Sequence, residues 1–142
     1  DHQIGTYGVI ALILSLAMRG TAITLIAEPH AVMAALIGAG AASRLSAVLI
    51  MTALPPARRD GLSTSVGSPT AGLAGITLWL TFMIAWLVLP FVVALLLILS
   101  AIVSAMVLGR VALTRLGGQT GDVLGASSQV CECLALIVLV IA

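Results

Sequence analysis

The stretch from Ala71 to Leu108 contains no charged side chain, and it constrains the fold more than any other feature of the sequence. It is 38 residues long, and its one proline is Pro90. As a single helix it would be about 57 Å long, whereas the hydrocarbon core of a bilayer is about 30 Å thick. Because proline breaks the interior of a helix, we predict two spans, Ala71 to Leu89 and Phe91 to Leu108, joined by a tight reversal at Pro90.

The composition of the whole chain agrees with a membrane setting. The 142 residues are 61% hydrophobic and 8% charged, far outside the fractions typical of soluble domains. The charged residues include six arginines, no lysine and five acids, with a net charge of +1, so there is no basic patch to which nucleic acid could bind. We therefore predict an all-α, polytopic integral membrane bundle in the lipid bilayer, a single domain over residues 1–142 with no nucleic-acid partner.

Three further apolar segments bring the expected number of transmembrane helices to about five. The first runs from Gly5 to Ala27, the second from Ala31 to Ala53, and the fifth begins at Asp122 and reaches the C-terminus. Within the second, Gly38, Ala42 and Ser46 form a ridge of small residues at four-residue spacing. Such a ridge predicts close contact with a neighbouring helix.

The polar links between the spans predict the orientation in the membrane. Five alternating spans place Asp1, the link Leu54 to Thr70 and the link Gly109 to Gly121 on one face. The short connections at Glu28 and Pro90 fall on the other face. The first face carries all the arginines found in links: Arg58, Arg59, Arg110 and Arg115. By the positive-inside rule, the polar links are expected to be cytoplasmic.

The link before the fifth span is a glycine-rich polar loop. Gly117, Gly118 and Gly121 permit unusual backbone conformations and let main-chain N–H groups approach a ligand. Thr120 is a candidate N-cap for the helix that follows. The unpaired N–H groups of that helix's first turn are electropositive. The pattern indicates a loop suited to an anionic ligand.

A stripe of polar residues continues from this loop along the fifth span. Asp122, Gly125, Gln129 and Glu132 are spaced so that they share one face of an otherwise apolar helix. Glu132 lies about 15 Å along the helix from Asp122. An intramembrane charge costs about 2.5 to 3.5 kcal/mol, so Glu132 should face protein or a water-filled cavity. The alternative interpretation is that Asp122 only starts the helix and Glu132 only hydrogen-bonds to a neighbouring helix.

The remaining polar residues within the spans have competing interpretations. Arg19 is expected to be a snorkelling or packing residue. Arg44 could snorkel, or it could point inward at an acid such as Glu132 or at a phosphate. Cys131 and Cys133 point about 200° apart on a helix, so they are interpreted as apolar packing residues rather than as a bridge or a metal site.

Together these groups indicate a class of substrate. Carboxylates bind Mg²⁺ through oxygen, while arginines and the N–H groups of a glycine loop hold phosphate oxygens. The combination points to a phosphate-bearing substrate and Mg²⁺ as cofactor. The loop is not a Walker loop, because the chain has no lysine.

Three separated motifs resemble the cobalamin synthase family (adenosylcobinamide-GDP ribazoletransferase). The first is LGGQTGDVLGA at Leu116 to Ala126, followed by Glu132. The second is DHQIGTYGVIALIL at Asp1 to Leu14, and the third is Arg44 with LPPARRDGL at Leu54 to Leu62. They occur in the family's order along essentially the whole chain.

This resemblance implies a Mg²⁺-dependent phosphotransferase of late cobalamin biosynthesis that lies in the cell inner membrane. Such an enzyme joins adenosylcobinamide-GDP to α-ribazole or its 5′-phosphate and releases GMP. The implied catalytic residues are Asp122, Asp1 and Arg58, and the implied metal ligands are Asp1, Asp122 and Glu132. The implied substrate-binding residues are Arg44, Gly117, Gly118, Thr120, Gly121 and Gln129.

The chain also departs from the family pattern. The family has a further N-terminal half with an aspartate-rich segment, so this chain is expected to be the C-terminal portion of a longer enzyme, and alone it need not be active. Gln129 stands where family members can carry Glu. A non-catalytic membrane subunit and a small transporter remain alternatives, and the sequence leaves a homo-oligomer open.

Overall fold

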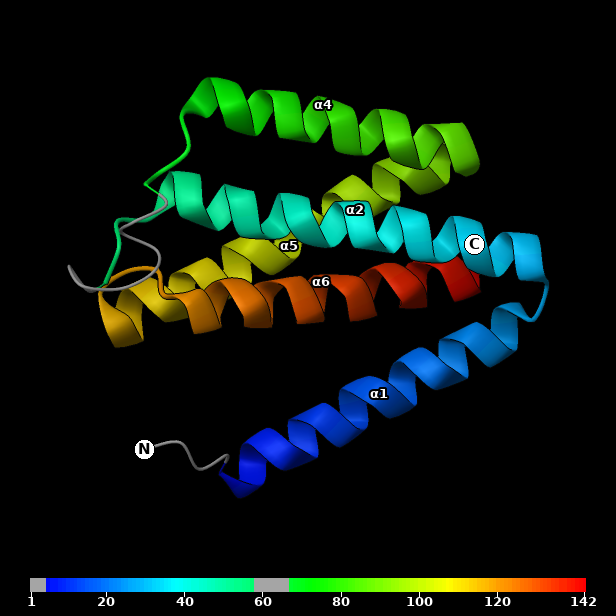
Figure 1. The fold of residues 1–142 in the computed structure, drawn as a ribbon, viewed down its shortest axis with the longest axis horizontal. Coiled ribbons are helices and arrows are strands. Elements are labelled where there is room, and N and C mark those ends of the chain that lie inside the picture. Colours follow the sequence, from blue (N-terminus) through cyan, green and yellow to red (C-terminus); the bar gives the residue numbers. More distant parts are fainter. Residues whose placement is uncertain (1–4, 58–66) are drawn as a thin grey trace.

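The computed structural model describes residues 5–57 and 67–142, and the regular elements in this part of the chain are all α-helices (Figure 1). They are α1 (Thr6–Ile26), α2 (Pro29–Ala53), α4 (Ala71–Val88), α5 (Phe91–Leu116) and α6 (Gly121–Ile141). Each of these five helices is long and apolar enough to cross a membrane. The prediction of an all-α, multi-pass membrane protein is therefore confirmed.

Helix α2 is the centre of the bundle. It packs against α4, α5 and α6, whereas α1 packs mainly against α6 and barely touches α2. Figure 1 shows α1 at one edge of the bundle, slanting away from the other four helices. The most extensive contact in the bundle is thus between α2 and α6, two helices that are far apart in the sequence.

The helices begin and end at the residues that the local signals favour. Glu28 caps α2 by accepting a 2.6 Å hydrogen bond from the Ala31 N–H, and Pro29 occupies the first turn. The predicted reversal at Pro90 is confirmed, because α4 ends at Val88 and α5 begins at Phe91.

Helix α5 is longer than expected. The predicted span ended at Leu108, but the helix continues to Leu116, so Arg110 and Arg115 lie in the helix and not in a link. Arginine is a good helix former, and a charge ends only the membrane-embedded part of a helix. With 26 residues, α5 is about 39 Å long and extends beyond a hydrocarbon core of about 30 Å. The helix ends at Gly117, whose φ of 75° is left-handed.

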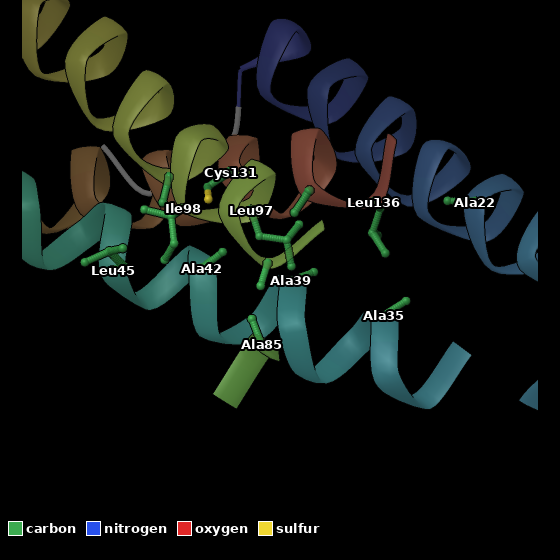
Figure 2. Close-up of a cluster of buried hydrophobic side chains, with 13 residues drawn as sticks. Ala22, Ala35, Ala39, Ala42, Leu45, Ala85, Leu97, Ile98, Cys131 and Leu136 are labelled. Atoms are coloured by element: carbon green, nitrogen blue, oxygen red, sulfur yellow. The ribbon is translucent and has the colours of Figure 1, made fainter. Parts of the chain in front are cut away.

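The buried core consists mostly of alanines, with a few leucine and isoleucine side chains among them. Figure 2 shows alanines such as Ala39 and Ala42 from α2 facing Leu97 of α5 and Cys131 of α6. The predicted ridge of Gly38, Ala42 and Ser46 is buried, as expected for close helix contact. Serine hydroxyls add hydrogen bonds between the helices: Ser46 hydrogen-bonds to Ser127, and Ser104 donates to the Ser127 carbonyl at 3.0 Å.

The two cysteines also behave as predicted. Cys131 and Cys133 are both free thiols with buried side chains. Cys131 belongs to the hydrophobic core, and Cys133 lies 3.9 Å from the Ser15 hydroxyl of α1. Their interpretation as packing residues is confirmed.

Candidate functional site

Two polar regions interrupt this apolar bundle. The first, called here the loop junction, consists of Pro55–Ala57 after α2 and Gly117–Asp122, which joins α5 to the first turn of α6. The second, called here the charge cluster, consists of Arg19 of α1 with Gln129 and Glu132 of α6.

The loop junction joins the two polar links by backbone hydrogen bonds. The Ala57 N–H donates to the Gln119 carbonyl and the Gln119 N–H donates to the Pro55 carbonyl, both at 2.9 Å. Together they form a parallel bridge between Pro56 and Gln119. The two links therefore lie on the same end of the bundle, as the alternation of spans predicted, and Figure 1 shows the end of α2 beside the start of α6.

The three glycines of the junction have three different surroundings. Gly117 supplies the left-handed turn that ends α5. A Cβ on Gly118 would lie 3.0 Å from the Ala57 nitrogen and still closer to the Pro55 carbonyl oxygen, so the backbones can approach only because this residue is glycine. A Cβ on Gly121, by contrast, would have nothing within 4 Å. Gly118 thus makes room for protein backbone, while Gly121 faces open space.

Gln119 is the residue of the junction that the sequence did not single out. Its side chain is fully buried, yet neither amide atom has a hydrogen-bond partner within the described part of the chain. A buried, unpaired amide costs about 1–3 kcal/mol. In the sequence, Gln119 is marked only by its position between the glycines and Thr120. That position does not show whether its side chain is buried or exposed.

Thr120 and Asp122 have separate functions at the start of α6. Thr120 is the N-cap, as predicted, and its hydroxyl accepts a 3.3 Å hydrogen bond from the Val123 N–H. Asp122 lies in the first turn with an exposed side chain. None of the described basic side chains forms an ion pair with it. Because Thr120 already caps the helix, the Asp122 carboxylate remains available to a ligand.

The charge cluster lies near the middle of the membrane-spanning helices. Arg19 Nη2 is 3.1 Å from Glu132 Oε2 and donates a 2.6 Å hydrogen bond to Gln129 Oε1. Only 21% of the Arg19 side chain and 26% of the Glu132 side chain are exposed. Glu132 is about 16 Å along α6 from its first residue, more than halfway through a span of about 30 Å.

This pairing corrects the expectation for Arg19. Arg19 was expected to snorkel or pack, but it neutralises Glu132 across two helices. Snorkelling depends on one helix alone, whereas Glu132 lies 113 residues further along the chain on another helix. The expectation that Glu132 faces protein is confirmed. The hypothesis that Arg44 is its partner is wrong, because that position is taken by Arg19.

Arg44 differs from Arg19 in its surroundings. It lies on α2 among buried neighbours but is itself exposed. Over residues 5–57 and 67–142, no acidic side chain pairs with it. A role in binding phosphate therefore stays a prediction for Arg44.

The predicted metal ligands do not converge within the described residues. Asp122 and Glu132 are about 15 Å apart along α6, too far for one ion whose ligand distances are about 2 Å. No group of three or more His, Cys, Asp or Glu side chains in the described part of the chain could hold a metal ion. Two residues implied at the site, Asp1 and Arg58, lie outside the described residues. Asp122 is thus the one predicted ligand that is described, exposed and not ion-paired with a described residue.

Comparisons with known proteins place this arrangement in a family. A family model described as Cobalamin-5-phosphate synthase matches residues 1–140. An adenosylcobinamide-GDP ribazoletransferase from Bradyrhizobium diazoefficiens is 41% identical over 138 residues, which cover 97% of this chain and 53% of the relative. One of the same name from Sinorhizobium medicae is 39% identical over 151 residues, covering 100% of this chain and 57% of the relative.

The chain spans about half the length of the curated relatives it matches. No solved structure matches it. Because the family model matches all but the last two residues, the chain belongs to the cobalamin-5-phosphate synthase family.

Proposed function

We propose that this chain takes part in transferring the cobinamide-phosphate group of adenosylcobinamide-GDP to α-ribazole or its 5′-phosphate, with release of GMP. The observation that carries the proposal is the family match over residues 1–140, together with relatives named adenosylcobinamide-GDP ribazoletransferase. Because the chain spans about half of those relatives, the activity is proposed for a protein of the relatives' length that contains this segment.

The loop junction supplies the chemistry that such a transfer requires. The first turn of α6 presents backbone N–H groups, which favour a diphosphate, and Gly121 leaves open space beside them. In the proposed reaction a ribazole hydroxyl oxygen forms a new bond to the phosphorus of the cobinamide phosphate. The bond from that phosphorus to the GMP oxygen breaks, and the hydroxyl proton is lost. Positioning and charge neutralisation supply most of the catalysis in such a step.

The proposed cofactor is Mg²⁺, with Asp122 as one ligand. Mg²⁺ typically uses one or two carboxylates together with substrate phosphates, so one available carboxylate at the junction fits part of such a site. When bound, it would neutralise charge on the diphosphate. We propose Asp1 and Arg58 as further site residues and Arg44 as a phosphate contact. We do not include Glu132 and Gln129 in this site, because both side chains already bind Arg19.

Replacement of Asp122 by Asn tests this proposal in a family-length protein containing this segment. Asn has nearly the same shape but no charge, and Thr120 still caps α6, so the protein should fold and insert normally. Turnover of adenosylcobinamide-GDP should fall about a hundredfold or more, as when a charge-stabilising group is lost.

A matched control is Glu28→Gln. Glu28 is also an exposed acid at the start of a helix, but it lies at the opposite end of the bundle. This variant should keep its turnover. Normal turnover and an unchanged Mg²⁺ requirement in Asp122→Asn would refute the proposed role of the carboxylate.

We further propose that the protein lies in the inner membrane with the loop junction in the cytoplasm. In a background with Cys131 and Cys133 replaced by alanine, a single cysteine is introduced at Ser68, in the link between α2 and α4, or at His30, in the first turn of α2. Both positions are exposed. An impermeant maleimide applied to spheroplasts should label His30→Cys and leave Ser68→Cys unmodified. The reverse pattern would overturn the orientation.

A further inference from the structure

A groove with mostly apolar walls lies between α2, α4 and α5, on the side of the bundle away from α1. Its volume is about 480 Å³. Its lining comes from all three helices and includes Ala53 of α2, Leu78 of α4, and Ile102, Gly109, Arg110 and Leu113 of α5. Arg110 is the one charged residue of this lining, and its side chain is exposed.

The packing of α4 and α5 explains why the groove lies towards the loop junction. At the Pro90 end, the rings of Phe82, Trp86 and Phe91 pack together with centroids 5.6 to 6.0 Å apart and hold the two helices close. Towards the junction the walls include the small residues Ala53, Ala105 and Gly109. Small side chains cannot fill the space between diverging helices, so a groove remains.

The dimensions of the groove match one leaflet of a bilayer. Along α5 it extends from Ile102 to Leu113, which is about 16 Å at the rise of an α-helix, close to half of a hydrocarbon core of about 30 Å. Arg110 lies about 10 Å along the helix from Gly117, at the end of the groove nearer the membrane surface. The groove is therefore mostly apolar, is about as long as one leaflet is thick, and has the Arg110 cation at its end nearer the membrane surface.

A partner for this surface must be apolar along its length and negative at one end. Within the described residues, the one ion pair is that of Arg19 with Glu132, so no described acid neutralises Arg110. Basic groups at the ends of grooves between membrane helices attract anionic lipid headgroups. We propose that the groove binds one acyl chain of an anionic phospholipid, whose phosphate pairs with Arg110.

Native mass spectrometry of the purified chain in detergent tests the proposal. The probes are phosphatidylglycerol and phosphatidylcholine with the same acyl chains. The chain should retain one phosphatidylglycerol, with an affinity about fivefold higher than for phosphatidylcholine, as expected for one basic residue near a headgroup. Arg110→Gln should remove this preference.

Two matched variants make the test specific. Arg115→Gln removes a charge from the same helix outside the groove lining and should leave the preference intact. Ala53→Trp fills the groove from an exposed position, so it should weaken the binding of both lipids without disturbing the core. Arg110 and Arg115 are both exposed, so their variants should fold normally. Equal losses in the two arginine variants, or undiminished lipid binding in Ala53→Trp, would overturn the proposal.

Discussion

The loop junction and the charge cluster both bring polar groups into a bundle of apolar helices, but different interactions hold them. The junction is formed by backbone hydrogen bonds between Pro55–Ala57 and Gln119, at the end of the bundle. The charge cluster is formed by side chains alone, near the middle of the spans, where Arg19 binds both Gln129 and Glu132.

This difference separates a region suited to chemistry from one suited to holding a helix in place. In the charge cluster, the Glu132 carboxylate is used by Arg19, and these contacts tie α1 to α6. At the junction, the backbone contacts fix the loops, while the Asp122 carboxylate stays exposed beside the electropositive start of α6. Polar residues on one helix stripe can therefore have unrelated functions.

The largest expected effect comes from breaking the charge cluster. Arg19→Met leaves the Glu132 carboxylate in the membrane without its cation, and Glu132→Met leaves Arg19 without its acid. Removing one partner of this partly buried intramembrane pair should cost roughly 3 kcal/mol of stability. Thermal or denaturant unfolding in detergent measures the loss.

The double variant sharpens this test. Arg19→Met with Glu132→Met removes both charges and should recover most of the lost stability, because neither charge is stranded. Losses that simply add in the double variant would contradict the pairing. The stranded charge in each single variant should also loosen α1 from α6, so a protease should cleave these variants near α1 faster than it cleaves the double variant.

The next largest effect should come from the glycines of the junction. A Cβ at Gly118 would overlap the Pro55 carbonyl oxygen, and backbone cannot move aside as a flexible side chain can. Gly118→Ala should therefore cost about 2 kcal/mol, in the range of overpacked sites. Turnover of a family-length protein should fall as well, because the junction positions Asp122.

Gly121→Ala is the matched control for Gly118→Ala. It adds the same methyl group, but the added Cβ has nothing within 4 Å, and Gly121 is already helical. Its stability should stay the same or rise by about 0.4 to 1 kcal/mol, since alanine restricts the unfolded chain. Equal losses at the two positions would show that the close approach at Gly118 does not limit stability.

Features that depend on local sequence could be predicted. The spans, the reversal at Pro90, the Thr120 cap and the buried ridge of Gly38, Ala42 and Ser46 all follow from hydrophobic length, proline and small-residue spacing. The shared end of the two links also followed, because alternating spans leave no other choice.

Features that depend on contacts between distant segments could not be predicted. The sequence shows that Glu132 needs a partner, and it suggested Arg44; that Arg19 is the partner becomes visible only once the position of α1 is known. The buried amide of Gln119 likewise depends on how the link after α2 covers it. The end of α5 was misplaced for another reason: a charge marks the membrane boundary and not the end of a helix.

The smallest expected effect on stability concerns Arg44, which shares its residue type with Arg19 but not its surroundings. Arg44 is exposed and has no described acidic partner, so Arg44→Lys and Arg44→Met should each change stability by no more than about 0.5 kcal/mol. If Arg44 holds a substrate phosphate, as we propose, Lys keeps the positive charge but cannot form the bidentate hydrogen bonds of a planar guanidinium group.

The affinity of a family-length protein for adenosylcobinamide-GDP should then fall about tenfold in Arg44→Lys, equivalent to about 1.4 kcal/mol, while its unfolding temperature stays unchanged. A loss of stability in Arg44→Lys would instead assign Arg44 to packing, because no phosphate is present in the unfolding measurement. Unchanged affinity together with unchanged stability would remove Arg44 from the site altogether, and it would leave Arg19 as the one described intramembrane arginine with a demonstrated contact.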